Sequence, residues 1–525
     1  MKTVGERMVE GLAARGVEVI FGIPGVHTVE MYRGLSGSPI RHVTARHEQG
    51  CAFMADGYAR ASGKPGVALV ITGPGITNAL TAMAQSRGDS VPVLVISGVN
   101  RRDSLGKGLG RLHELPDQQA MVRALCPSRQ ITDPGQVAEV LDWAFATMAT
   151  GRPGPVHIEV PTDVMPLPCP ALAAPADLPA KVMASDADLA RAAALLNAAK
   201  RPLILAGGGA RGVDKALRAL AERLDVPVVM TVNARGMLHG HTLGVPASPS
   251  LQAVRDLIAG ADQVLVLGSE LGLTDYDMYA TGTLPALGQM IRVDICADQL
   301  ARHPAGLTVR ADAAGFIAKI LPLLDAKQAT GAARAEATRT RARVNLGELY
   351  APMPGQLQMV EAIRTALPAC VIVGDSTQPV YAANLFYDHD RPGGWFNAAT
   401  GYGALGFGPG AAVGAALALP GVPVVCLIGD GGLQFSPGEL RTAVDEKLPV
   451  TFVVWNNAGF MEIAEAMRGA GTEVIGCTPS PLRMEAFAAA CDLPFTSIPE
   501  EPEVLTWALS QACEGPRMIE IRVKR

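Results

Sequence analysis

Two polar segments near the C-terminus, each following an apolar run, constrain the fold of this chain most. Gly429-Asp430-Gly431-Gly432 follows the apolar run Val422–Ile428, and Asn456-Asn457 ends a second run that starts at Val450. The segment Pro437–Lys447 between them has a helical pattern. A strand, a helix and a second strand in this order form a βαβ unit of a parallel sheet. Both polar segments are therefore predicted to meet at one carboxyl edge of that sheet, where ligands bind.

The side chains at this predicted edge suit a magnesium-bound diphosphate. Asp430 and Asn457 offer carboxylate and amide oxygens, which are ligands that Mg²⁺ prefers. Gly429, Gly431 and Gly432 leave backbone N–H groups free for phosphate oxygens beside the start of a helix. The alternative is two ordinary polar strand ends. We predict that Asp430 and Asn457 bind the metal and that the glycines bind the phosphates.

Strand-like and helix-like segments alternate along the whole chain. Apolar runs typical of buried strands form three groups of four, at Val17–Phe21, Val67–Thr72, Val91–Ser97 and Val156–Val160, then Pro202–Ala206, Val226–Val232, Val264–Gly268 and Met290–Ile295, then Cys370–Val373, Val422–Ile428, Val450–Asn456 and Arg517–Val523. This alternation predicts an α/β fold of three doubly wound parallel sheets covered by helices. We place the domains at residues 1–165, 185–325 and 350–525. A Pro- and Ala-rich linker is predicted from Pro161 to about Met183, and a charged helix or second linker at Ala326–Arg343.

Composition limits the classes of partner. The 525 residues are 49% hydrophobic and carry a net charge of −5, which gives no electrostatic reason to expect nucleic acid or an anionic membrane. Prolines interrupt the charge-free segment Pro392–Gly429, so a buried helix and strand are predicted there and not a membrane span. The nine cysteines contain no C-x-x-C pair, and Glu6 and Glu10 fall too early for a signal peptide. We expect reduced thiols in a cytoplasmic protein.

Several motifs in a fixed order resemble those of one enzyme family. GDG-x24-NN, ending at Asn457, resembles the diphosphate-binding signature of thiamine-diphosphate enzymes. Nearly the whole chain is similar to the acetolactate synthase and 2-oxo-acid decarboxylase group, through the segments VIFGIPGVHTVE, ARHEQGCAFMADGYAR, ITGPGITNAL, GRPGPVHIEVPTDV and GALGFGPGAAVGAAL. The resemblance implies a pyrimidine-binding domain, a Rossmann-like middle domain and a diphosphate-binding domain, in that order.

The resemblance also implies roles for single residues. The family glutamate, matched by Glu48, bonds N1′ of the cofactor's aminopyrimidine and so promotes loss of the thiazolium C2 proton. Leu405 matches an apolar residue that wedges between the two cofactor rings, and the Gly403 carbonyl would accept from the 4′-amino group. The Gly459 carbonyl would be a third Mg²⁺ ligand, and Asp375-Ser376-Thr377 would contact the diphosphate. Outside this context, Glu48 would be a solvated helix start and Leu405 a core residue.

The family further implies an oligomer. Its counterparts of Glu48 and Asp430 act on the same cofactor from different subunits, so the resemblance implies a homodimer or homotetramer with active sites at the subunit interface. The substrate class it implies is a small-molecule 2-oxo acid.

A glycine-rich motif in the middle domain suggests a different cofactor. Gly207–Gly212 satisfies G-x-G-x-x-G after a predicted strand, as dinucleotide-binding sites do. In acetolactate synthases the middle domain binds FAD, and an Arg-Phe-Asp-Asp-like stretch follows the strand matched by Val264–Gly268. This chain reads GSELGLTDY over Gly268–Tyr276 instead, which argues against bound FAD without excluding it.

Three further residues bear on the substrate. His27 and His113 are candidate proton donors to the carbon left after decarboxylation, each with the alternative of a structural or surface histidine. Glu462, with Glu465 about one helical turn later, would suit a cationic substrate tail, the alternative being a solvated helix face. The segments VHTVE, NRRD–GRLHELPDQ and LGSELGLTDYDMY resemble the 5-guanidino-2-oxopentanoate (2-ketoarginine) decarboxylase branch.

We therefore expect non-oxidative decarboxylation of a 2-oxo acid with thiamine diphosphate and Mg²⁺, and 5-guanidino-2-oxopentanoate is the favoured substrate. The first alternative is an acetolactate synthase-like carboligase that acts on pyruvate. A catalytically silent binding protein and an NAD-linked oxidoreductase are weaker alternatives, since Glu48, Asp430 and Asn457 are all present.

Overall fold

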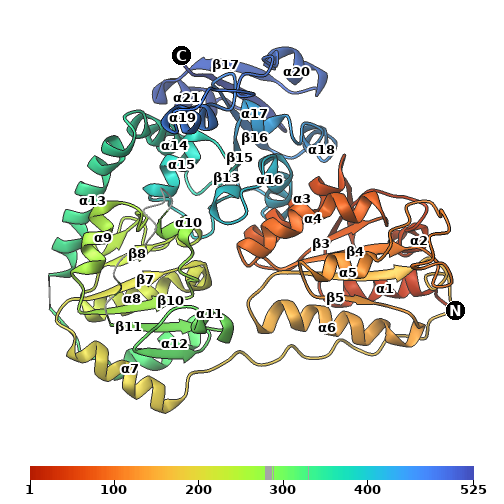
Figure 1. Cartoon of the computed structure of the whole chain (residues 1–525), viewed down its shortest axis with the longest axis horizontal. Coiled ribbons are helices and arrows are strands. Elements are labelled where there is room, and N and C mark those ends of the chain that lie inside the picture. The colour runs from red at the N-terminus through yellow and green to blue at the C-terminus, as the bar shows by residue number, and fades with distance from the viewer. Residues whose placement is uncertain (278–286, 288, 329, 525) are drawn as a thin grey trace.

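The computed structural model describes residues 1–277, 287, 289–328 and 330–524. The chain forms three lobes, each built on one six-stranded sheet (Figure 1). The first lobe contains β1 Val19–Gly22, β2 Arg41–Thr44, β3 Gly66–Val70, β4 Val93–Val99, β5 Ser128–Gln130 and β6 Pro155–Pro161. Its helices are α1 Val4–Ala14, α2 Val29–Leu35, α3 Glu48–Ser62, α4 Pro74–Gly88, α5 Gln118–Arg123, η1 Pro134–Gln136 and α6 Val137–Thr150.

The middle lobe follows along the chain. Its strands are β7 Pro202–Ala206, β8 Val228–Met230, β9 Gly244–Val245, β10 Gln263–Leu267, β11 Met290–Asp294 and β12 Leu307–Arg310. Its helices are α7 Asp186–Ala198, η2 Gly208–Val213, α8 Asp214–Leu224, η3 Val232–Ala234, α9 Gln252–Ala259, α10 Leu273–Tyr276, α11 Ala297–Ala301, α12 Ala313–Ile320 and η4 Leu321–Leu323. The motif LGSELGLTDYDMY ends at Met278 and Tyr279, which lie outside the described residues.

The third lobe completes the chain. Its strands are β13 Val371–Gly374, β14 Trp395–Asn397, β15 Val424–Gly429, β16 Val450–Asn456, β17 Phe495–Pro499 and β18 Arg517–Arg522. Its helices are α14 Met353–Ala366, α15 Gln378–Leu385, η5 Ala398–Thr400, α16 Phe407–Ala418, α17 Asp430–Leu433, α18 Glu439–Asp445, α19 Met461–Gly469, α20 Met484–Ala490 and α21 Pro502–Ser510. The long helix α13 Gly331–Leu349 connects the middle and third lobes, as Figure 1 shows.

The strand orders confirm the predicted fold class. The first sheet runs β2-β1-β3-β4-β6-β5 and the third runs β14-β13-β15-β16-β18-β17, so the two share one topology. The middle sheet runs β12-β11-β10-β7-β8-β9, the order of dinucleotide-binding folds. Neighbouring strands in the third sheet are parallel. β14 is added on one side of β13 and β15 on the other, so the order of strand addition reverses between β13 and β15. This places the ligand-binding crevice outside the carboxyl ends of these two strands.

The predicted connections are found where the sequence placed them. After β6 and a turn at residues 162–166, the chain runs without regular structure along the base of Figure 1 until α7 begins at Asp186. The predicted charged helix is α13. The strands of each sheet fall inside the domain ranges 1–165, 185–325 and 350–525, while the boundaries themselves stay predictions. Among the described helices, none combines the length and hydropathy needed to cross a bilayer.

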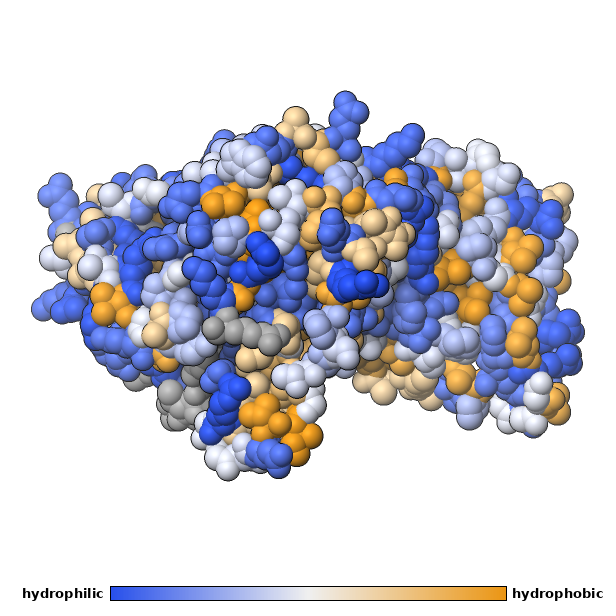
Figure 2. Space-filling model, turned by 90° about the horizontal axis from the view of Figure 1, so that it is seen from above, coloured by the Kyte–Doolittle hydropathy of each residue, from blue (hydrophilic) through white to orange (hydrophobic). Residues whose placement is uncertain are grey.

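Two glycines allow the first and third lobes to pack backbone against backbone. A Cβ at Gly57 of α3 would lie 2.0 Å from the Ala411 carbonyl oxygen of α16, and one at Gly414 would lie 1.9 Å from the Met54 carbonyl oxygen. The backbones of the two helices therefore touch directly. Helix α16 belongs to the charge-free segment, which is thereby buried against α3. The face seen from above in Figure 2 mixes hydrophilic residues with scattered hydrophobic ones.

One buried carboxylate joins all three lobes. Asp89, which has a side chain 2% exposed, accepts hydrogen bonds from Arg60 (2.9 Å) and Gln85 (3.1 Å) of the first lobe. It also accepts from Asn233 of the middle lobe (3.0 Å) and from Thr400 Oγ1 of the third lobe (2.8 Å). Several charge-assisted hydrogen bonds thus meet in a site shielded from water.

Replacing Asp89 with asparagine is expected to reduce stability by about 2 kcal/mol, because the amide nitrogen would face donors and the charge would be lost. The measurement is the apparent Tm. Glu139→Gln is the matched control, since that carboxylate pairs with Arg129 on the surface and should change stability by less than about 0.5 kcal/mol. An equal Tm for both variants would show that Asp89 does not join the lobes.

Candidate active site

Three oxygen atoms converge at the carboxyl edge of the third sheet. Asp430 begins α17 directly after β15, and Asn457 follows β16. One end of the Asn457 amide lies 3.2 Å from Asp430 Oδ1 and 2.8 Å from the Gly459 carbonyl oxygen, and its Nδ2 donates to Gln378 Oε1 at 3.1 Å. With Nδ2 bonded to Gln378, Oδ1 faces two other oxygens. The amide turned by 180° would donate to both of these oxygens, whereas the orientation with Oδ1 toward them suits a hard divalent cation.

The electrostatics of Asp430 fit a cation at this place. The side chain is 5% exposed. Burial raises its pKa, while the backbone N–H groups of Asn457, Gly431 and Gly459 oppose that rise. A bound divalent cation would favour the carboxylate form and offset the cost of desolvation. The three predicted metal ligands, Asp430, Asn457 and Gly459, are thus brought together and fit Mg²⁺.

The glycine turn beside these ligands is closely packed. A Cβ at Gly431 would lie 2.6 Å from the Phe460 ring, and one at Gly432 would lie 3.0 Å from Asp375 Oδ1. A Cβ at Gly429 would lie 3.1 Å from Thr377 Oγ1. Side chains at these positions would therefore fill the space next to the converging oxygens. Phosphate binding by the turn stays a prediction.

The segment after β13 lies across the crevice from Asp430, but its three residues differ in orientation. Asp375 is fully buried, and its carboxylate accepts from the backbone N–H groups of Gly408 (2.9 Å) and Ser376 (2.8 Å). Burial raises its pKa to about 6. This carboxylate therefore holds the start of α16, so a phosphate contact is better suited to Ser376 and Thr377.

The loop that carries Gly403 and Leu405 is fixed by the first lobe of the same chain. Gln85 of α4 accepts from the Ala404 N–H at 3.1 Å and donates to the Ala398 carbonyl at 3.3 Å. Gly403 has a φ of 80°, a conformation that favours glycine. Leu405 is half-buried, as a side chain that contacts a ligand on its open face would be.

Glu48 is the first residue of α3. Its Oε2 accepts from Asn78 Nδ2 of α4 at 3.0 Å. His47 is the N-cap, and its Nδ1 accepts from the Gln49 N–H at 3.2 Å. The carboxylate is half-buried and held by a neutral amide, which leaves its second oxygen for a ligand.

The two candidate proton donors, His27 and His113, lie together. Their ring centroids are 5.2 Å apart, and Nδ1 of each ring is buried without a hydrogen-bond partner among the described residues. Burial and the neighbouring His113 lower the pKa of His27. His113 has a φ of 60°. Residues far apart in the sequence thus form one pair at the carboxyl edge of the first sheet.

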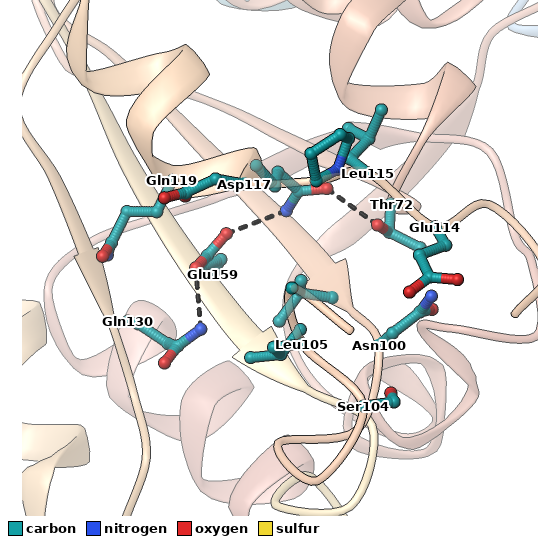
Figure 3. Close-up of a pocket in the computed structure, with 14 residues that line it drawn as sticks. Thr72, Asn100, Ser104, Leu105, Glu114, Leu115, Asp117, Gln119, Gln130 and Glu159 are labelled. Atoms are coloured by element: carbon teal, nitrogen blue, oxygen red, sulfur yellow. Dashed lines mark hydrogen bonds between the residues drawn. The ribbon is translucent and has the colours of Figure 1, made fainter. Parts of the chain in front are cut away.

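A polar cavity of about 280 Å³ opens beside this pair (Figure 3). Gln118 lines the cavity, where it donates to Glu159 Oε2 at 2.9 Å and accepts from Thr72 Oγ1 at 2.8 Å. Glu159 also accepts from Gln130 at 2.8 Å. Figure 3 shows these side chains together with Glu114 around the cavity. The residues that line it include three carboxylates and no lysine or arginine.

Glu462 and Glu465 lie one turn apart on α19, as predicted. Partial burial and the nearby Glu465 raise the pKa of Glu462. Burial raises the pKa of Tyr381 to about 12, and the charge of Glu462 contributes to this rise. Glu465 accepts a hydrogen bond from Arg468 at 2.6 Å, which leaves Glu462 as the freer carboxylate of the two.

Two glycines of the middle-lobe motif, Gly207 and Gly209, pack closely against Gly268. Gly207 N–H donates to Leu267 O, Gly209 N–H to Gly268 O and Ala210 N–H to Gly207 O. A Cβ at Gly207 would lie 2.3 Å from Gly268 O. These three N–H groups are therefore not available to a pyrophosphate, while Gly208, Gly209 and Arg211 line a cavity of about 410 Å³.

The match to known families agrees with this geometry. The description "Thiamine pyrophosphate enzyme, N-terminal TPP binding domain" matches residues 2–121, the central domain of the same family matches 189–320 and its C-terminal TPP binding domain matches 374–521. The chain belongs to the thiamine pyrophosphate enzyme family, and the resemblance inferred from its motifs is confirmed.

Two curated relatives and one solved structure are similar to this chain along most of its length. The chain is 42% identical over 485 residues to "Probable 2-ketoarginine decarboxylase AruI" of Pseudomonas aeruginosa, covering 91% of this chain and 86% of that one. It is 33% identical over 472 residues to the acetolactate synthase isozyme 1 large subunit of Escherichia coli, covering 87% and 82%. The X-ray structure of "a putative thiamin diphosphate-dependent enzyme" from Mycobacterium smegmatis matches with a TM-score of 0.84 at 24% identity over 100% of both chains, which shows the shared fold.

Proposed function

We propose that this enzyme uses thiamine diphosphate and Mg²⁺ to decarboxylate a 2-oxo acid, with 5-guanidino-2-oxopentanoate as the substrate and an aldehyde and CO₂ as products. The observation that carries the proposal is the convergence of Asp430, Asn457 and Gly459 oxygens at the crevice of the third sheet. The similarity to a relative named as a probable 2-ketoarginine decarboxylase supports the substrate.

Each predicted residue has a task that its surroundings support. When bound, thiamine diphosphate supplies a nucleophilic carbon and an electron sink for C–C cleavage. Asp430, Asn457 and Gly459 would hold Mg²⁺, and Glu48 would hold a proton at N1′ of the pyrimidine. His27 and His113, whose rings lie together, would supply the proton that the aldehyde carbon of the product needs, and the lowered pKa of His27 makes its protonated form the stronger acid.

We infer that the site is completed by a second copy of the chain. Within one chain, the Glu48 carboxylate is held by Asn78 of the first lobe, while the metal ligands lie at the crevice of the third. Apolar side chains are exposed beside both halves, including Val26 and Leu112 near the histidines and Phe435 and Ile463 near the metal ligands. A homodimer or homotetramer would bury such residues.

The acidic groups around the site favour a cationic substrate tail. Burial and Glu465, and not a lysine or arginine, determine the pKa shift of Glu462. The residues that line the cavity beside His113 include no lysine or arginine. A guanidinium can bond a carboxylate through two parallel N–H groups. The FAD of acetolactate synthases is not part of the proposal, because residues Gly268–Tyr276 differ from the stretch that those synthases carry.

A panel of 2-oxo acids, assayed for CO₂ release with added cofactor and Mg²⁺, tests the substrate. We expect kcat/KM for the guanidino acid to exceed that for pyruvate by about 100-fold or more, since a site built for polar groups rejects substrates that lack them. Glu462→Gln should raise KM for the guanidino acid about 10-fold and leave pyruvate unaffected. Glu503→Gln on α21 is the control.

An acetolactate synthase-like carboligase is the second candidate, supported by 33% identity to such a synthase. Product analysis separates the two. Conversion of pyruvate to acetolactate, with no activity on the guanidino acid, would establish the carboligase and reject the decarboxylase.

A further inference from the structure

Glu439 reaches from the third lobe into the first. It is the first residue of α18 and is 1% exposed. Its Oε1 and Oε2 accept from the Arg46 N–H at 3.2 and 3.3 Å, and Oε1 also accepts from the His47 N–H at 3.1 Å. Thr442 Oγ1 donates to Oε2 at 2.8 Å. The backbone amides that this carboxylate holds belong to the two residues that precede Glu48.

The start of α3 is shaped around this carboxylate. A Cβ at Gly50 would lie 2.0 Å from Glu439 Oε1, so only glycine lets the helix approach it so closely. Burial raises the pKa of Glu439, while bonds from Thr442, Arg46 and His47 oppose the rise. A buried carboxylate costs more free energy than an apolar contact of the same size. The carboxylate instead fixes the orientation of the backbone, because it accepts hydrogen bonds from two specific N–H groups.

We propose that Glu439 is a positioning residue for Glu48. It fixes the turn before α3, and Asn78 then orients the Glu48 carboxylate, so that this carboxylate meets the pyrimidine ring in one place. The proposal rests on the proposed function. Asp430 and Glu439 lie in the same lobe. In the proposed oligomer, Glu48 and Asp430 of one chain serve two different active sites, so the contact between Glu439 and the turn before Glu48 connects these two sites.

Glu439→Gln tests the proposal in the full-length protein. The amide can accept from one N–H, but its NH₂ group faces the other. We expect kcat to fall about 10-fold, because misplacing a reacting group is costly, with KM for the 2-oxo acid and the Mg²⁺ affinity changed less than about 2-fold. Amide hydrogen exchange at residues 46–50, measured without cofactor, should become faster while that of β15 is unchanged. Gly50→Ala should reproduce both effects by displacing the carboxylate.

A double-mutant cycle separates positioning from a general structural role. If Glu439 acts through Glu48, then Glu48→Gln/Glu439→Gln should have the same kcat as Glu48→Gln alone. Asp56→Asn, which removes another fully buried carboxylate from α3 beyond this turn, is the control and should lower Tm without faster exchange at 46–50. Additive losses in the cycle, a normal kcat in Glu439→Gln, or a loss of kcat without faster exchange would each overturn the proposal. Calorimetry on the unaltered protein comes first, since absence of cofactor binding there would reject the proposed function instead.

Discussion

Replacing Glu48 with glutamine is expected to leave thiamine diphosphate bound and to lower kcat by about 100- to 10,000-fold, the range that proton transfer by a positioned group contributes. Glutamine keeps the size of the side chain and the hydrogen bond to Asn78, but its amide cannot transfer a proton to or from N1′. The measurement pairs steady-state CO₂ release with calorimetric titration of the cofactor. Glu18→Gln, an exposed glutamate of the same lobe, is the control and should behave as the unaltered enzyme.

A Glu48→Gln enzyme that turns over at a near-normal rate would remove Glu48 from the mechanism. Loss of cofactor binding in the same variant would instead assign the residue to affinity and not to proton transfer.

Replacing Asp430 with alanine is expected to weaken Mg²⁺-dependent binding of thiamine diphosphate by at least about 100-fold, because the only carboxylate among the three converging ligands is lost. Asp430→Asn retains an oxygen ligand without the charge and should fall between the alanine variant and the unaltered enzyme. Titration of the cofactor at several Mg²⁺ concentrations gives the affinities.

Asp492→Asn is the control for this series, since Asp492 pairs with Arg441 at the surface of the same lobe. An Asp430→Ala enzyme with the same Mg²⁺ dependence as this control would place the metal elsewhere.

The strands inside each sheet could be predicted from the sequence, and those at the edges could not. All four inner strands of each sheet coincide with apolar runs, since both faces are covered by helices. The two edge strands of each sheet were missed: β2, β5, β9, β12, β14 and β17. β12 alternates buried and exposed residues, and β9 has two residues. Such strands are too short or too polar to form an apolar run.

The candidate site shows a similar division. Asp430 and Asn457 could be placed together because they directly follow two apolar strands of one βαβ unit, whereas Gly459 was implied only by the family resemblance. Gln378, Asn78 and Glu439 were missed, because each acts through a contact between segments distant in the sequence and is surrounded by no motif. His27 and His113 were predicted singly, and only the fold brings them together.

The central claim is that each active site combines Glu48 of one subunit with Asp430 of another, and mixing two inactive variants tests it most directly. Glu48→Gln and Asp430→Ala chains with different affinity tags would be co-expressed, and the dimer that carries both tags purified. One of its two sites would then contain both altered residues and the other neither. The account predicts about half of the unaltered activity per dimer. A mixed dimer as inactive as its parents would show that both residues serve a site within one chain.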